Sequence, residues 1–218
     1  MHPKLLVDML KNTSVRPAYI NRINKLENTM ASVVLFLESD TYPDQVQTTN
    51  YYEFDMESST GNGTDYMALM TVNPEAESSG RRSFTVIKPV EQTLFEPFIK
   101  QGYPGDYESY SRVKDQVADK MIEQICSKFP ELAGNLRVLD VSTPVTFNRY
   151  TRTVDGCMYG VKQCVSYRGL TTRTSVRNLF LAGQSIQMGV MGSVVSGFIA
   201  AMQIVDNKRL EKEIRLCL

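Results

Sequence analysis

In this sequence of 218 residues, the residue types that are scarce exclude the most classes of active site. Its single histidine is His2, near the chain start, where disorder is expected. A Ser-His-Asp triad, a Cys-His pair or a His-rich zinc site therefore cannot be assembled from this sequence. Acid–base chemistry would fall to carboxylate, Tyr, Lys or Cys side chains. A reaction carried by a bound cofactor fits this composition better than one carried by side chains alone.

Other absences concern charge, membrane spans and disulfides. Lys plus Arg and Asp plus Glu number 24 each, so no net charge is expected to attract nucleic acid or acidic membranes. No run of apolar residues is long enough to span a bilayer, and residues 1–10 are too short and polar for a secretory signal. The four cysteines form no CxxC pair, which favours a reducing compartment. We predict a cytoplasmic protein, with peripheral membrane association as the alternative.

The apolar pattern predicts an α+β protein of ordinary composition, with 42% hydrophobic and 22% charged residues. Helices are expected at residues 3–28 (two short ones), 106–129, 146–150 and around 210–217. Strands are expected at 31–37, 49–55, 66–72, 83–90 and 135–143. Because most of these strands are joined by loops such as 58–64 and 73–80, the sheet should be largely antiparallel. Residues 91–105 are expected to be irregular, with Phe95, Phe98 and Tyr103 capping the core rather than lining a cavity.

The strongest site signal lies in residues 176–201. Residues 178–182 are a short apolar run that predicts a buried strand ending at Gly183. A polar loop with Gly189 and Gly192 follows, and then apolar residues recur at helical spacing. The unpaired N–H groups and the positive dipole end of such a helix favour an anion, and glycines let a ligand approach the backbone. Tight packing of a helix on a sheet would explain the same glycines.

Two segments carry a resemblance to a known family. The first contains Asn178-Leu-Phe-Leu-Ala-Gly-Gln-Ser, Gly189-Val-Met-Gly192, Ser196-Gly197 and Ala200-Ala201. The second lies before it and contains Thr143-Pro-Val-Thr146, Arg149-Tyr150 and Gly156-Cys-Met-Tyr159-Gly160. The first resembles the carboxyl-terminal flavin motif of the phytoene desaturases, carotenoid isomerases and all-trans-retinol saturases, and the second resembles the segment that precedes that motif. The pair Gly183-Gln184, where many relatives have Gly-Asp, is closer to the retinol saturases.

The resemblance implies a fragment of a two-domain FAD-dependent oxidoreductase. The sequence contains no GxGxxG, so the half that binds the ADP part of FAD would be missing and would act as a partner. Residues 1–142 would form an incomplete substrate-binding domain, a mixed and largely antiparallel sheet with helices on one side. Residues 143–218 would be the carboxyl-terminal return segment of the FAD domain, the strand–turn–helix of a two-dinucleotide-binding type.

The resemblance also implies roles for individual residues. The residues expected to bind FAD are Gly183, Gln184, Ser185, Gly189, Val190, Met191 and Gly192. The start of the helix would stabilise negative charge on the reduced flavin. The neighbours expected for an apolar substrate are Tyr150, Tyr159 and Met188, and ordinary packing is the alternative for each. No catalytic residue and no metal ligand is assigned.

The implied reaction is the desaturation, saturation or isomerisation of a conjugated polyene such as a carotenoid or retinol, with FAD as the redox group. A non-catalytic module that binds an apolar ligand or a partner with the same fold is the alternative function. NAD(P) is the alternative cofactor, disfavoured because no βαβ unit with a following acidic residue is present. No nucleic-acid partner is expected, and peripheral membrane contact and a homodimer are left open.

Overall fold

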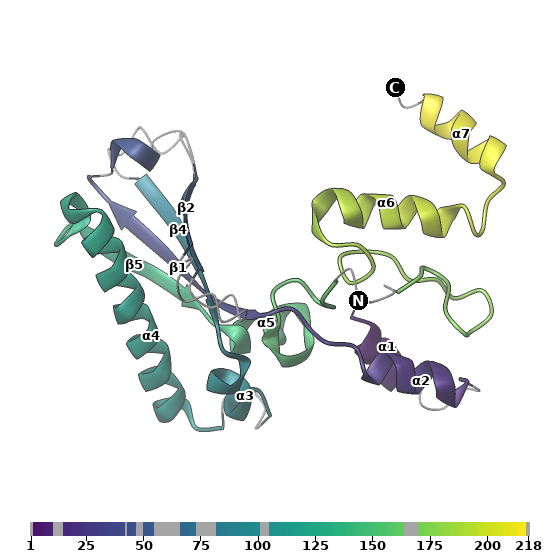
Figure 1. The fold of residues 1–218 in the computed structure, drawn as a ribbon, viewed down its shortest axis with the longest axis horizontal. Coiled ribbons are helices and arrows are strands. Elements are labelled where there is room, and N and C mark those ends of the chain that lie inside the picture. The colour runs from purple at the N-terminus through teal and green to yellow at the C-terminus, as the bar shows by residue number, and fades with distance from the viewer. Residues whose placement is uncertain are drawn as a thin grey trace. The chain divides into compact units, whose positions relative to one another are not determined.

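The computed structural model describes residues 2–10, 15–41, 43–46, 50–54, 66–72, 82–100, 105–163 and 170–216. The chain forms two compact units (Figure 1). Unit 1 combines Met1–Thr29 with Arg152–Leu218, and unit 2 is Met30–Thr151. The expected functional boundary after residue 142 lies inside unit 2, and residues 2–29 belong with the carboxyl-terminal segment. The assignment of functions to the two segments stays a prediction.

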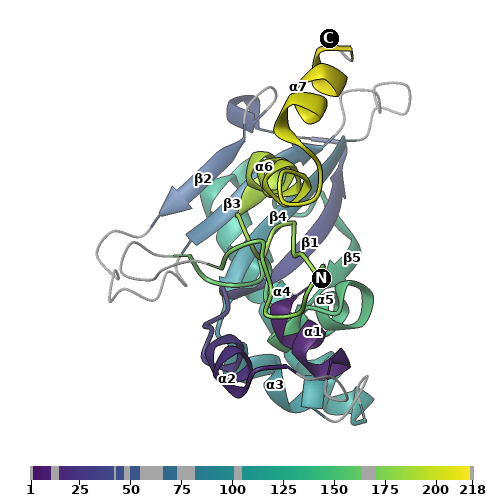
Figure 2. The ribbon, with the colours of Figure 1, turned by 90° about the vertical axis from the view of Figure 1, so that its right-hand side faces the viewer.

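Unit 2 is built on an antiparallel sheet of five strands in the order β2-β3-β4-β1-β5, which Figure 2 shows. The strands are β1 (Ala31–Ser39), β2 (Tyr51–Phe54), β3 (Tyr66–Val72), β4 (Arg82–Val90) and β5 (Leu136–Ser142). In the centre of the sheet, Leu35 of β1 lies opposite Val86 of β4 and Val141 of β5. The predicted α+β class and antiparallel sheet are confirmed, and each expected strand of unit 2 is present.

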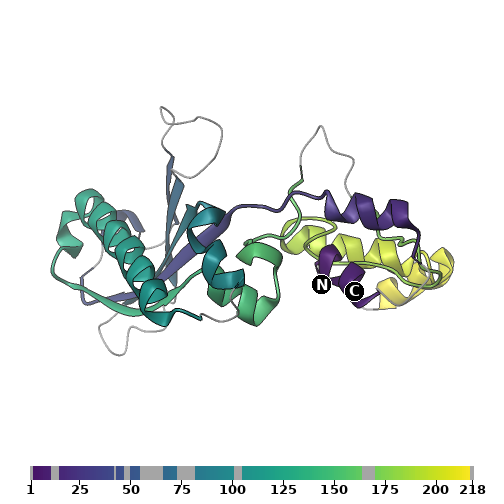
Figure 3. The same ribbon diagram turned by 90° about the horizontal axis from the view of Figure 1, so that it is seen from below.

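Helices α3 (Gln92–Lys100) and α4 (Tyr107–Lys128) cover one face of this sheet (Figure 3). Alternate residues of β1 point to that face, and Leu35, Leu37 and Phe84 are almost completely buried there. The apolar stripe of α4 contributes Met121 and Ile125, which are fully buried in the same cluster. The core of unit 2 therefore forms where alternating strand residues meet a helix with one apolar face. Short 3-10 helices, η1 (Asp44–Val46) and η3 (Pro130–Leu132), and helix α5 (Pro144–Thr151) complete the unit.

The prediction of irregular structure for residues 91–105 is wrong, because residues 92–100 form α3 even though Pro97 lies inside the helix. Burial explains the difference. Phe95 and Phe98 are both buried, and their rings meet Tyr110 edge-on, with centroid separations of 6.5 and 5.6 Å. The expectation that these aromatic rings belong to the core is confirmed, whereas Tyr103 and the predicted loops 58–64 and 73–80 lie outside the described residues.

Unit 1 contains short helices and long connections. Its helices are α1 (Pro3–Met9), α2 (Pro17–Asn24), η4 (Val154–Gly156), α6 (Gly189–Ala201) and α7 (Asn207–Leu216). Its buried apolar residues fall into two small clusters. One consists of Val7, Ile23, Leu26 and Val161, and the other of Leu6, Leu181 and Ile186. Among the helices that the structure describes, none is long and apolar enough to cross a membrane.

The strand predicted at residues 178–182 is not formed in the described structure. Phe180 makes only an isolated antiparallel bridge with Arg173, and Asn178 adopts a positive φ of 61°. Two backbone hydrogen bonds, from Leu181 to Thr172 and from Thr174 to Leu179, hold this segment as a narrow hairpin. The turn and the helix of the expected strand–turn–helix are present, and features specific to a flavoprotein domain stay predictions.

Candidate functional site

The turn before α6 is fastened to the helix by a buried hydroxyl. The carbonyl of Gly183 accepts hydrogen bonds from the N–H groups of Ile186 and Gln187, at 2.9 and 3.2 Å. The Gly183 N–H donates to Oγ of Ser196 at 2.7 Å, and that hydroxyl donates in turn to the carbonyl of Ser193. Because Ser196 is completely buried, this link fixes the turn on the second and third turns of α6.

The start of α6 is open on its N–H side. Its N-cap residue is Met188, whose side chain makes no capping hydrogen bond, and the first turn carries no acidic residue. The side chains of Val190 and Met191 are 82% and 74% exposed. Uncapped N–H groups at the positive end of a helix dipole favour a negatively charged or strongly polar group.

The glycines of this region have two different physical roles. Gly183 and Gly189 have φ values of 107° and 82°, which side chains rarely allow, and the space beside each is empty. At Gly192 a Cβ would lie 2.9 Å from the carbonyl carbon of Gln187. Gly192 therefore permits close packing of α6 on its own turn, and its expected contact with a ligand stays a prediction. At Gly183 and Gly189 the space beside the backbone is open, so a ligand could approach it there.

The loop at residues 152–160 lies beside this turn. Four of its residues have positive φ: Arg152, Asp155, Gly156 and Gly160. The side-chain amide of Gln184 donates to the carbonyl of Met158 at 3.1 Å, and a Cβ on Gly160 would collide with the hydroxyl of Ser185. The structure thus brings together two segments that the sequence singled out separately.

The three residues expected near an apolar substrate divide between the units. Tyr150 belongs to unit 2, is highly exposed and lies with its ring 5.4 Å from the guanidinium of Arg149. Tyr159 and Met188 belong to unit 1 and are also exposed. The backbone N–H of Tyr159 donates to Oγ1 of Thr29 at 2.9 Å, which fixes the backbone of this residue. Their role towards a substrate stays a prediction.

Sequence reasoning missed a buried polar group at the chain start. The expectation that His2 is disordered is wrong, because His2 is only 5% exposed and caps helix α1. Its ring contacts Asn28, which in turn contacts Asp155. The pair His2-Pro3 was an available signal, since proline favours the first position of a helix and the residue before it is the cap. Nothing in the sequence near Asn28 indicated its partners.

The described residues include two free cysteines, one of which is buried. Burial raises the pKa of the Cys157 thiol, which keeps the thiol protonated near neutral pH. Neither Cys157 nor Cys126 forms a disulfide. Within the described ranges, no group of three or more His, Cys, Asp or Glu residues could hold a metal ion.

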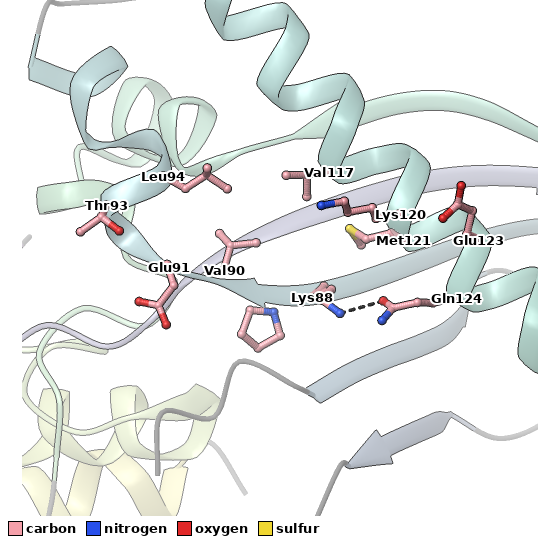
Figure 4. A pocket seen from close by; sticks show the side chains of 11 residues that line it. Lys88, Val90, Glu91, Thr93, Leu94, Val117, Lys120, Met121, Glu123 and Gln124 are labelled. Carbon is pink, nitrogen blue, oxygen red and sulfur yellow. Dashed lines mark hydrogen bonds between the residues drawn. The ribbon is translucent and has the colours of Figure 1, made fainter. Parts of the chain in front are cut away.

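Unit 2 contains a separate pocket of about 790 Å³ that the sequence did not indicate (Figure 4). It lies between the end of β4, the start of α3 and the middle of α4. Its apolar lining comes from Val90, Leu94, Val117 and Met121, and charged side chains of both signs surround it. One of these, Lys88, donates to the side chain of Gln124 at 2.7 Å. The volume suits a small apolar molecule.

Comparison with known proteins links the chain to one kind of enzyme. The all-trans-retinol 13,14-reductase of Danio rerio is 19% identical over 158 residues, which cover 66% of this chain and 26% of that protein. The chain thus has weak, partial similarity to an all-trans-retinol 13,14-reductase. The resemblance to retinol saturases predicted from residues 143–201 is thereby confirmed.

A second relative has a different description. A protein of Danio rerio named inactive all-trans-retinol 13,14-reductase is 26% identical over 106 residues, 45% of this chain and 17% of that protein. The matches thus span about a quarter or less of these relatives. No protein-family model matches the chain, and no solved structure matches it significantly.

Proposed function

We propose that this chain is the carboxyl-terminal part of an FAD-dependent oxidoreductase that acts on CH–CH bonds of a conjugated polyene, such as retinol or a carotenoid. The observation that carries the proposal is the similarity to a retinol 13,14-reductase. The turn at Gly183 and the uncapped start of α6 support it, because they lie where the family motif would contact the cofactor.

The residues present fit one part of an FAD site. The empty space beside Gly183 and Gly189 leaves the backbone accessible, and the N–H groups at the start of α6 would face a developing negative charge. Gln184 would offer its amide to the ribityl hydroxyls, although it now donates to Met158. Bound FAD would supply the hydride or electron transfer, while the protein would orient the polyene and exclude water.

A missing FAD-binding half would also cover α6. This helix exposes a set of large apolar side chains: Val190, Met191, Val194, Val195 and Phe198. Such a surface on a helix of small residues is typical of a contact with another part of a protein. The relatives are several times longer than the regions that match this chain. A longer protein of this kind would supply that contact.

The test measures flavin and turnover in two proteins. The purified 218-residue chain should retain little FAD, seen as absorbance near 450 nm. A longer protein with a GxGxxG-bearing segment before residue 1 should retain FAD and convert all-trans-retinol or a carotenoid, followed by chromatography of the products. Stoichiometric flavin in the 218-residue chain would contradict the idea that this chain holds only part of the FAD site. A longer protein without flavin would contradict the proposal that the enzyme depends on FAD.

A non-catalytic module that binds an apolar ligand is the second candidate. The similarity to the relative named inactive favours it, and the pocket beside Val90 and Met121 offers a place for such a ligand. This candidate predicts that retinoid binding, measured by fluorescence, survives in the short chain and weakens in Met121→Lys. It also predicts no turnover in the longer protein.

A further inference from the structure

Three polar side chains in unit 1 form a directional chain of hydrogen bonds. Nδ1 of His2 accepts the backbone N–H of Lys4 at 3.2 Å, so this nitrogen carries no proton. The neutral ring must then hold its proton on Nε2, which lies 3.0 Å from Oδ1 of Asn28 and donates to it. The amide nitrogen of Asn28 donates to Oδ2 of Asp155 at 3.0 Å. Each partner has only one role open to it, which fixes the tautomer of His2.

The network lies where the chain leaves and re-enters unit 1, after Thr29 and at Arg152. Asn28 forms an antiparallel bridge with Val161, and the N–H of Thr29 donates to the carbonyl of Gly160 at 2.8 Å. Residues 27–29 are thus held beside residues 160–162. The hydrogen bond from Asn28 to Asp155 extends this contact to the first residues of the loop 152–160. Asp155 itself has a φ of 59°, a conformation that needs support from its surroundings.

The charges around His2 bias its ring towards the neutral form. Burial is the largest cause that lowers the pKa of His2, and the positive charge of Lys4 lowers it further. The hydrogen bond to Asn28 and the negative charge of Asp155 oppose this effect. The charges of Lys4 and Asp155 also act on the buried thiol of Cys157.

A proton on Nδ1 would put two donors face to face, because the Lys4 N–H already points at this atom. The cap of α1 would be lost, and a charged ring would sit in a position only 5% exposed. The ring can relieve both conflicts only by moving towards water, which breaks its contact with Asn28. Helix α1 would pass this movement of the ring on to the turn at Gly183, since Leu6 of α1 packs against Leu181 and Ile186 on either side of that glycine.

We propose that His2, Asn28 and Asp155 form a proton-sensitive clasp that holds residues 152–160 against residues 27–29, and that proton uptake by His2 opens it. The clasp is a property of unit 1 and does not require FAD. Its effect on Gln184, through the carbonyl of Met158, concerns the flavin site and rests on the proposed function. The clasp can therefore be tested on the 218-residue chain alone.

The experiment is hydrogen–deuterium exchange with mass spectrometry at pH 8 and pH 5.5, corrected for the intrinsic pH dependence of exchange. His2 is the only histidine, but the amino group of Met1 in the 218-residue chain also titrates over this range, so a chain acetylated at its amino terminus is measured in parallel and should show the same change. We expect protection of peptides from residues 152–160 to fall about tenfold at the lower pH, the size expected from losing a hydrogen bond. Peptides from β1 and β4 in unit 2 should not change, and they serve as the internal control.

Two variants separate the clasp from the helix cap. His2→Asn keeps an oxygen that can cap α1 but is too short to reach Asn28, so it should exchange fast at both pH values. Asp155→Asn keeps an acceptor and tolerates the positive φ, so it should keep its protection at pH 8. Circular dichroism at pH 8 checks that each variant is folded.

Two results would overturn the proposal. One is wild-type protection of residues 152–160 that stays constant between pH 8 and pH 5.5. The other is a His2→Asn variant that keeps the pH dependence of the wild type. The flavin experiments above can fail without affecting either measurement, so the two proposals are tested separately.

Discussion

The two units differ in how they are held together. Unit 2 has one continuous apolar core between a five-stranded sheet and two helices. In unit 1 the described residues bury only two small apolar clusters, and hydrogen bonds from side chains to residues distant in sequence connect its loops. The comparison shows that unit 2 is stabilised mainly by the burial of apolar side chains, so substitutions at its surface should change its stability little. Unit 1 depends on individual polar contacts and leaves a large part of α6 uncovered.

The units also differ in charge. Unit 1 has fourteen Lys and Arg residues against six Asp and Glu, a formal charge of +8. Unit 2 has ten against eighteen, a charge of −8. The zero net charge of the chain conceals this opposition. A positive unit favours anionic ligands such as the pyrophosphate of a dinucleotide, which agrees with the function proposed for its glycine turn.

The largest expected effect tests the core of unit 2. Phe84→Ala should lower the free energy of unfolding by about 3–5 kcal/mol, because it leaves a cavity among fully buried neighbours. Val194→Ala on the exposed side of α6 is the control and should change it by less than about 0.5 kcal/mol. Urea unfolding followed by circular dichroism measures both. Similar losses in the two variants would remove the contrast between the units.

A pair of glycines in α6 gives the next largest effect. Gly192→Ala should destabilise the protein by about 1–3 kcal/mol, since its Cβ would meet the backbone of Gln187. Gly197→Ala meets nothing within 4 Å and should stabilise the helix by up to about 1 kcal/mol. Thermal unfolding of the two variants provides the comparison. A neutral Gly192→Ala would show that the turn adapts and that packing does not require this glycine.

The smallest expected effect concerns pH and unit 2. The backbone N–H of Ser109 donates to Asp106 at the start of α4 and lowers the pKa of that carboxyl group. A carboxylate with a lowered pKa stabilises the fold above its unfolded value of 3.8, and this contribution is lost as the pH falls through the folded value. Asp106→Asn, which keeps a capping oxygen, should reduce the acid sensitivity of α4. Unfolding midpoints between pH 6 and pH 3 would show it, and identical profiles for the two proteins would contradict it.

Local pattern predicted the sheet and α4 well, because alternating β-branched residues and a helical apolar stripe each need only short-range information. It failed at α3, where burial of Phe95 and Phe98 outweighs the cost of Pro97. It failed at residues 178–182, where an apolar run lacks neighbouring strands in the described chain. In the site, the family motif located the turn, but no local signal could pair His2 with Asn28 or Asn28 with Asp155, which are 26 and 127 residues apart.

The order in which the two units can be completed during synthesis follows from the chain path. Residues 2–29 are synthesised before unit 2, yet their partners in unit 1 begin only at Arg152. Unit 2 is continuous in sequence and can fold as soon as it emerges, whereas unit 1 must wait for the segment that begins at Arg152. During that interval the nascent amino-terminal helices expose Leu6 and Ile23 without their later contacts, such as Leu181 and Val161.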